Sequence, residues 1–346
     1  MSKKLLPKNL PLVRANSLFP LLKFLHENSI PLENFFYKST IPENIFSQPE
    51  NLLSLHQVFN AIDSFAHRQG IDYLGVLASE KLEIEDLGLF GKILRQSFTG
   101  YDLLKTIITL LSKTYSSGVR VWLKEENDVI WFNHQYPNLQ YDKNRQGGYY
   151  AFFLHFQAIR SMIGFDWYPT DLYFQGQTVK GLSDIDLFSR SRIHFNQRYN
   201  SIGISKNVLY LPLKRESQNI DYNEEQDLYE HLISSSPDVD FSKALQQLIR
   251  SQLLGGNIQI QTIADAIGMS KRSLQRCLGD RGLSYFHLLD QVRFQLAVEW
   301  LKDTNIPIGE IAFELHYSEI NSFTRSFKRW TGVTPSDYRY RLHSTR

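Results

Sequence analysis

Residues 321–335 read NSFTRSFKRWTGVTP, and this stretch decides the fold of the C-terminal part of the chain. Phe323 and Phe327 lie four residues apart, so both fall on one face of a helix and can pack inward. Gly332 is typical of the end of a helix, and the Thr-Pro pair that follows is typical of the start of the next one. The outward face of the predicted helix carries Asn321, Thr324, Arg325 and Lys328.

A similar unit lies 48 residues earlier in QTIADAIGMSKRSLQRCL, residues 261–278. Each unit has an Ile-Ala pair, then Gly268 or His316, then Ser270 or Ser318 before a second amphipathic segment. Small residues let two helices pack closely, a residue that tolerates positive φ makes the turn, and serine can cap the next helix. Histidine is one of the less strained non-glycine residues at such a turn. The sequence therefore predicts helix-turn-helix written twice.

The first unit also predicts a polar outward face. Leu274 and Leu278 lie one turn apart and should pack inward. Guanidinium and amide groups are the side chains that pair with guanine or adenine edges in the major groove. A polar stripe on one helix alone is more often a solvated face, but two in tandem within a basic segment favour DNA recognition. The outward face carries Arg272, Gln275 and Arg276 in the first unit, and Asn321, Thr324, Arg325 and Lys328 in the second.

Charge divides unevenly along the 346 residues. Residues 1–241 hold 24 Lys and Arg against 27 Asp and Glu, and residues 242–346 hold 14 against 9. The net charge is therefore −3 in the first part and +5 in the second, which favours a nucleic-acid surface near the C-terminus. A single cysteine, Cys277, excludes an internal disulfide framework. With no apolar run of signal-peptide or membrane-spanning length, we expect a cytoplasmic protein with no membrane partner.

The segment between the two units predicts a long connecting helix. SYFHLLDQVRFQLAVEWLKD begins at Ser284, a candidate cap, and carries apolar residues at near-helical intervals, Phe286 among them. About 19 helical residues at ~1.5 Å each span roughly 28 Å, which is comparable to the ~34 Å between successive major grooves. One monomer could thus place both helices in adjacent grooves.

The first part of the chain has a mixed pattern. Helical spacing of apolar residues dominates the first 110 residues and returns in the aromatic-rich segment 147–163. Alternation and a charged turn predict a hairpin over 119–132. Further short strands are predicted at 171–175 and 207–213. The fold class predicted is an α+β N-terminal sensor domain followed by an all-α C-terminal domain, with domains at 1–215 and 241–346 and a polar, acidic linker at 216–240.

The C-terminal motifs closely resemble the DNA-binding domain of AraC/XylS-type transcriptional regulators. IADAIGMSKRSLQRCL and IGEIAFELHYSEINSFTRSFKRWTGVTPSDYR carry the resemblance, which covers about residues 241–341. It implies seven helices, two of which read double-stranded DNA. Carried over by position, the resemblance implies base contacts from Arg272, Gln275 and Arg276, then from Asn321, Thr324 and Arg325, and phosphate contacts from Lys271 and Lys328. Ile320 departs from the family, which is often polar or proline there. The resemblance also makes RNA polymerase a candidate partner, because many such regulators are activators.

The first part resembles the arabinose-operon-regulator-like effector-binding domain of one subgroup of this family. VRANSLFPLLKFL, LGLFGKILRQSFTGYDLL at 87–104, Arg145-Gln146 and IHFNQRYNSIGISKNVLYLPL at 193–213 carry this resemblance. It implies a domain that senses a small molecule and forms homodimers, although members of the subgroup answer to differing signals. A ligand-free dimerisation scaffold is the alternative.

No residue pattern in the N-terminal part predicts catalysis, a metal site or a cofactor. There is no phosphate loop, dinucleotide fingerprint, nucleophile elbow or histidine pair at metal-ligand spacing, and His134, His155 and His194 are scattered along the sequence. We therefore expect a protein that is not an enzyme, and the second alternative is a small-molecule-binding protein whose C-terminal helices dock a protein partner. The surplus of aromatic residues can line a pocket or simply fill a core. The candidate effector-binding residues are Arg145, Tyr149 and Arg160.

Overall fold

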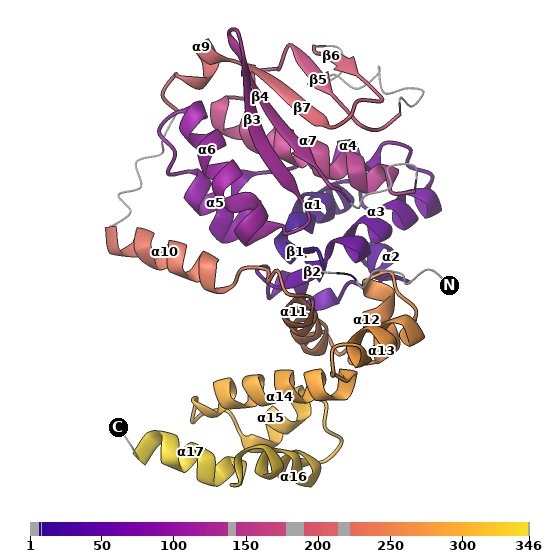
Figure 1. Cartoon of the computed structure of the whole chain (residues 1–346), viewed down its shortest axis with the longest axis vertical. Coiled ribbons are helices and arrows are strands. Elements are labelled where there is room, and N and C mark those ends of the chain that lie inside the picture. Colours follow the sequence, from indigo (N-terminus) through magenta and orange to yellow (C-terminus); the bar gives the residue numbers. More distant parts are fainter. Residues whose placement is uncertain (1–6, 8, 138–142, 178–189, 214–221, 345–346) are drawn as a thin grey trace.

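The computed structural model describes residues 7, 9–137, 143–177, 190–213 and 222–344, and Figure 1 gives their arrangement. The N-terminal part is α+β and the C-terminal part is all helical, which confirms the predicted fold class. The N-terminal helices are α1 (Phe19–Glu27), α2 (Glu33–Phe36), α3 (Leu55–Gln69), α4 (Leu74–Ser79), α5 (Gly88–Leu94), α6 (Gly100–Leu110), α7 (Arg145–Ile163), α9 (Lys206–Leu209) and α10 (Tyr222–Ser234).

Two sheets lie in the N-terminal part. The larger has five strands in the order β3-β4-β7-β5-β6, and the smaller pairs β1 with β2. The predicted hairpin is confirmed as the antiparallel pair β3 and β4, whose register joins Arg120 to Gln135. The strands are β1 (Leu12–Arg14), β2 (Leu52–Ser54), β3 (Arg120–Glu126), β4 (Val129–Gln135), β5 (Asp171–Tyr173), β6 (Arg192–His194) and β7 (Asn200–Ser205).

Helix α7 is the centre of the N-terminal core. It begins at Arg145, two residues before the predicted start, and packs against α3, α4 and α6. Phe132 and His134 of β4 point to α7, since residues two apart share a face of the sheet. The His134 ring stacks on Phe152 with centroids 5.4 Å apart, and it lies 4.6 Å from the ring of His155. The fold thus brings together two histidines that are distant in the sequence.

The small sheet belongs to two cores at once. Val13 pairs with Leu53, and both pack in the N-terminal core. Leu12 and Leu52 pack instead with the C-terminal helices. Successive side chains on a strand point to opposite faces, so one face of this sheet packs in the N-terminal core and the other face packs in the C-terminal core.

The C-terminal part consists of short helices around the longer α14. Its hydrophobic cluster runs from Phe241 to Phe327 and includes Leu10 from the N-terminal part. In Figure 1 helices α12 and α13 lie beside the N-terminal part, whereas α15 to α17 lie at the end of the molecule farthest from it. The helices are α11 (Phe241–Leu254), α12 (Ile260–Ala266), α13 (Lys271–Gly279), α14 (Tyr285–Leu301), α15 (Ile308–Glu314), α16 (Ile320–Thr331) and α17 (Pro335–Ser344).

Two local predictions are wrong. The strand predicted at 207–213 is one turn of helix, α9, because strand β7 already ends at Ser205 and the chain turns there. Phe286 was expected to face the core, but 74% of its surface is exposed. Its neighbour Tyr285 takes the buried position, and residues next to each other on a helix point about 100° apart.

The predicted linker contains a helix. α10 packs against α5, and Leu232 is fully buried in the N-terminal core. Residues 216–221 of this segment lie outside the described part of the chain. The domain boundaries at 215 and 241 stay predictions. Within the described residues no helix is both long and apolar enough to cross a membrane.

Candidate nucleic-acid interface

The first helix-turn-helix unit consists of α12 and α13. Gly268 makes the turn with φ of 70°, and the Ser270 side chain accepts a hydrogen bond from Ser273 N, as expected of a cap. Leu274 and Leu278 are fully buried. Burial raises the pKa of the Cys277 thiol, which also faces the core. The outward residues Lys271, Arg272, Gln275 and Arg276 are all exposed.

The second unit consists of α15 and α16. His316 has φ of 56°, the conformation that Gly268 has in the first unit, and its ring lies 2.8 Å from the carbonyl oxygen of Leu253. This contact fixes the turn to helix α11. Phe323 and Phe327 are fully buried, as predicted from their spacing. On the opposite side Asn321, Arg325 and Lys328 are exposed and Thr324 is half-buried.

The start of α16 differs from the prediction. Ser318 was expected to cap this helix, but Glu319 occupies the N-cap position and no side chain caps it. The second unit is shifted by one residue relative to the first, which places a glutamate where the serine was expected. Ile320 then begins the helix with 53% of its surface exposed. The caps of the neighbouring helices, Ser284 and Thr334, are confirmed.

The basic residues of both faces are available to a ligand. In the described part of the chain no ion pair involves Lys271, Arg272, Arg276, Arg325 or Lys328. Arg325 donates one hydrogen bond to Ser322 Oγ at 3.2 Å, on its own helix. In contrast Arg329, one residue after Lys328, pairs with Asp290 at 2.8 Å. Both outer faces therefore hold cations whose counter-charge must come from solvent or from a partner.

Two other arginines, outside the predicted DNA-contacting faces, hydrogen-bond to backbone carbonyl groups of the two units. Arg293 on α14 donates to Leu315 O at 3.0 Å, and its guanidinium lies over the ring of Tyr317. Arg281 donates to Cys277 O at 2.9 Å and to Pro7 O at 2.6 Å. The contacts with Leu315 O and Cys277 O hold carbonyl groups at the ends of α15 and α13, where acceptors have no partner within the helix. The contact with Pro7 O joins the first unit to the N-terminal part. Sequence reasoning missed both roles, because neither arginine lies in the repeated motif.

Helix α14 sets the distance between the units. It has 17 residues, slightly fewer than predicted. At ~1.5 Å per residue it is about 26 Å long, against ~34 Å between successive major grooves.

The three candidate effector residues all lie on α7, with Arg145 and Tyr149 one turn apart at its start and Arg160 near its end. Arg145 lies at the start of α7, where the Asp63 carboxylate accepts hydrogen bonds from Gln146 N and Gly147 N at 2.8 and 3.1 Å. Burial raises the pKa of this carboxyl to about 6. Tyr149 donates to Gln177 O at 2.9 Å. Arg160 donates to Tyr168 Oη at 2.7 Å. The structure does not bring the three together.

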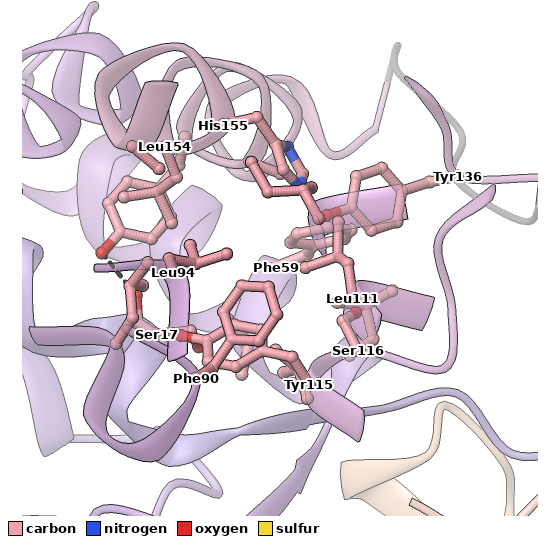
Figure 2. A pocket seen from close by; sticks show the side chains of 18 of the residues that line it. Ser17, Phe59, Phe90, Leu94, Leu111, Tyr115, Ser116, Tyr136, Leu154 and His155 are labelled. Atoms are coloured by element: carbon pink, nitrogen blue, oxygen red, sulfur yellow. Dashed lines mark hydrogen bonds between the residues drawn. The ribbon is translucent and has the colours of Figure 1, made fainter. Parts of the chain in front are cut away.

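A buried cavity lies elsewhere in the N-terminal core, and none of these three residues lines it. Its volume is about 60 Å³. Its walls come from β1, the short 3-10 helices η1 (Ala15–Leu18) and η3 (Ile84–Leu87), α3, α5, α6, β4, α7 and the π-helical turn η4 (Leu111–Tyr115). Figure 2 shows Phe90, Leu94 and Leu111 facing this space, with Tyr115, Ser116 and His155 at its edge. The Tyr150 hydroxyl donates to Ser17 O at 2.7 Å across one side.

Comparison with known proteins places the C-terminal part in a family. A helix-turn-helix domain model matches residues 263–341. The ornithine utilization regulator of Pseudomonas aeruginosa is 38% identical over 104 residues, which are 29% of this chain and 31% of that protein. The regulator VirS of Mycobacterium tuberculosis is 35% identical over 102 residues, 30% of each chain. The chain thus spans about a third of the length of these curated relatives.

The regulatory protein SoxS of Escherichia coli is 36% identical over 105 residues, which are 29% of this chain but 96% of SoxS. Nearly the whole of this regulatory protein is therefore matched by less than a third of the present chain. The solved structure of the transcriptional regulator CdpR from Pseudomonas aeruginosa is 18% identical, with a TM-score of 0.42 over 94% of this chain and 98% of that one. The chain belongs to the AraC family of helix-turn-helix transcriptional regulators, and its C-terminal part is the DNA-binding domain. The resemblance of the N-terminal part to an effector-binding domain stays a prediction.

Proposed function

We propose that the protein is a one-component transcription regulator in which the N-terminal part controls DNA binding by the C-terminal part. The observation that carries the proposal is the pair of exposed basic and amide faces on α13 and α16, each backed by buried apolar residues and joined by α14. In this proposal the two helices enter successive major grooves of one DNA duplex. The whole-chain proposal goes beyond the matched region.

Each outward residue has a role in this proposal. The guanidinium and amide groups of Arg272, Gln275, Arg276, Asn321 and Arg325 hydrogen-bond to base edges, and Thr324 contacts a base beside them. Lys271 and Lys328 neutralise phosphates, which makes affinity depend on salt through counterion release. The protein binds as a homodimer and activates transcription through contact with RNA polymerase, in response to a small-molecule effector. Ornithine is not proposed as that effector, because the match to its regulator lies in the DNA-binding domain.

The first test is selection of bound fragments from sheared DNA of the source genome by the full-length protein at near-physiological salt, followed by footprinting. We expect a sequence-specific footprint over two successive major grooves, or a doubled one if two monomers bind. Binding of equal strength on all fragments would contradict the proposal and would favour a C-terminal part that docks a protein partner. Transcription of a footprinted promoter with purified RNA polymerase then tests activation.

A ligand-free dimerisation scaffold is the second candidate for the N-terminal part. Phe98, Tyr210 and Leu211 each expose more than half of their surface, and Leu213 N donates to Phe98 O, so these residues lie in one region. Exposed apolar side chains grouped in this way are typical of protein interfaces. Sedimentation of wild-type protein and of Leu211→Asp tests this candidate. Dimers lost in the variant, together with no stabilisation by any small molecule, would favour the scaffold over the sensor.

A further inference from the structure

We propose that the buried cavity of the N-terminal part binds an uncharged, mainly apolar molecule of about the size of one six-membered ring, carrying a hydroxyl or carbonyl group. The inference rests on the proposed sensing function and names the chemical class of the effector.

The size of the ligand follows from the cavity. A cavity that holds one water molecule needs roughly 10–15 Å³ of space open to the centre of a water-sized sphere. The cavity volume of about 60 Å³ therefore corresponds to about four to six water-sized positions. The walls are predominantly aliphatic and aromatic, so water held there would make few hydrogen bonds. An apolar ring fills such a space better than water does.

The polar group of the ligand follows from buried atoms without partners. The hydroxyl groups of Tyr115 and Ser116 are buried, line the cavity and have no hydrogen-bond partner among the described residues. The Ser17 hydroxyl is in the same situation. An unsatisfied buried polar group costs about 1–3 kcal/mol, so a group in this state needs an explanation. A hydroxyl or carbonyl oxygen on the ligand would give a partner to one of these hydroxyl groups, each of which can donate or accept a hydrogen bond.

The absence of charge follows from the electrostatics. None of the described residues that line the cavity is Asp, Glu, Lys or Arg. Burial lowers the pKa of His155 to about 4, so this ring is neutral near pH 7. Behind Tyr115 lies the buried guanidinium of Arg14, but it is already bonded to Thr114 O at 2.8 Å and to Glu50 Oε2 at 2.7 Å. A carboxylate in the cavity would thus be buried without a partner, which is costly.

The cavity also adjoins the DNA-binding domain. Leu55, Phe59 and Tyr136 line both the cavity and a cleft between the two parts of the molecule. Across that cleft are Ile267 and Met269, which flank the turn of the first helix-turn-helix unit. A ligand that moves the shared side chains therefore acts on the turn that positions α13.

The test uses three probes that share a cyclohexane ring: cyclohexanol, methylcyclohexane and the somewhat larger cyclohexanecarboxylate. Each is titrated into the full-length protein at pH 7, with binding followed by calorimetry and by thermal unfolding. We expect the two neutral probes to bind and to raise the unfolding temperature, because a ligand of the folded state stabilises it. The carboxylate should bind at least about 100-fold more weakly than cyclohexanol, since it must bury an unpaired charge.

Variants locate the site. Tyr115→Phe removes one oxygen from the cavity wall and should weaken cyclohexanol about three- to tenfold while leaving methylcyclohexane unchanged. Tyr101→Phe, on α6 outside the cavity, is the matched control and should change neither. Ala151→Leu places extra carbon in the cavity and should prevent binding of both neutral probes. If Ala151→Leu does not fold, the comparison of cyclohexanol with methylcyclohexane on Tyr115→Phe still shows whether the probes bind in this cavity.

The outcomes separate this inference from the proposed function. If neither neutral probe binds, or the carboxylate binds as well as cyclohexanol, the ligand class is wrong, whatever the DNA footprint. If Ala151→Leu binds both neutral probes as tightly as wild type does, and Tyr115→Phe does not weaken cyclohexanol, the probes bind elsewhere and the site is wrong. Binding in the cavity with no specific footprint, or with a footprint that no probe alters, would leave the ligand site in place and contradict the sensing function.

Discussion

The two helix-turn-helix units have the same local fold but different surroundings. At the first, a Cβ added to Gly268 would lie only 2.8 Å from Nε2 of His56 on α3, so the turn touches the N-terminal part. At the second, the turn residue His316 contacts Leu253 O within the C-terminal part. Figure 1 shows the same contrast, with α13 next to the N-terminal part and α16 on the far side of α14. The first unit is therefore the one through which the N-terminal part can act.

Other contacts strengthen this difference. Arg281, just after α13, donates to Pro7 O and lies over the ring of Phe241 at 4.8 Å. Ser251 Oγ on α11 accepts a hydrogen bond from Leu52 N of β2. Together with the shared small sheet, these contacts make the first unit and the N-terminal part a continuous packed body. The second unit is joined to this body through α11 and α14.

The largest effect is expected from Arg14→Ala. This fully buried guanidinium also donates to Leu232 O and Ser235 Oγ at 3.1 Å, in the segment that leads into α11. Its loss removes the cation that pairs with Glu50 and leaves several carbonyl groups without this donor, and we expect about 3–5 kcal/mol less stability. Urea unfolding followed by hydrogen exchange would measure the loss and show whether α12 and α13 become exposed before α16.

The control for this variant is Arg250→Ala, which breaks an exposed pair with Glu299 within the C-terminal part and should have little effect. Equal protection of α13 and α16 in Arg14→Ala would contradict the view that the first unit is the coupled one.

The second effect is a loss of stability in acid that is confined to the N-terminal core. Burial lowers the pKa of His155 to about 4 and that of His134 well below its usual value. Between pH 6.5 and 4 the unfolded chain binds protons that the folded chain does not, so stability falls as pH falls. For His155 this amounts to about 2 kcal/mol at pH 5 relative to pH 8. Asp63 acts in the opposite direction, because its raised pKa of about 6 favours the folded state as pH falls below that value.

Thermal unfolding of wild-type protein and His155→Phe from pH 8 to pH 5 isolates the histidine, since Asp63 is common to both chains. The variant should lose less stability toward pH 5 than wild type does, and His26→Phe, outside this core, should behave as wild type. Parallel pH profiles for His155→Phe and wild type would mean that this imidazole titrates normally in the folded chain.

The sequence predicted the C-terminal part more closely than the N-terminal part, for physical reasons. The second half of each unit is decided by local spacing: Phe323 with Phe327, Leu274 with Leu278, and a positive-φ residue at each turn. Such signals are contained within one or two turns of helix. The error at Ser318 was also local, because a one-residue shift at a helix start changes which side chain can cap it.

The N-terminal site could not be predicted, because its residues meet only through long-range packing. His134 and His155 lie on β4 and α7, and Tyr115 ends an irregular helical turn. The shared role of Leu12 and Val13 depends on which cores lie on each side of β1, and neither strand pattern nor propensity specifies that. Arg145, Tyr149 and Arg160 were chosen for charge or hydroxyl groups near one helix, whereas the cavity is lined by apolar residues from many elements.

The third effect compares base readout by the two units. Arg276→Ala and Arg325→Ala should each cost about 1–3 kcal/mol of binding to the selected site and relax base preference at one position, with folding intact. Lys271→Ala should instead weaken binding to all sequences and reduce the slope of affinity with salt by about one. Binding assays on a library of single-base variants of the footprinted site give both quantities. Uniform weakening by Arg276→Ala or Arg325→Ala would contradict base readout by that helix.

The smallest effect measures the contact at the first turn directly. Gly268 and Gly282 both have φ of 70°, but a Cβ at Gly282 would meet nothing within 4 Å. Alanine should cost about 1 kcal/mol of stability at either position from backbone strain. Gly268→Ala should cost up to about 1 kcal/mol more, because the new methyl group displaces the His56 ring.

A double-mutant cycle between Gly268→Ala and His56→Ala isolates that excess from the backbone strain, and the same cycle with Gly282→Ala is its control. We expect coupling only in the first cycle, and we expect Gly268→Ala to alter DNA binding less once His56 is removed. If the two cycles give the same coupling energy, the first turn is not coupled to the N-terminal part through His56. The β1–β2 sheet and Arg281 would then be the contacts that couple the two parts.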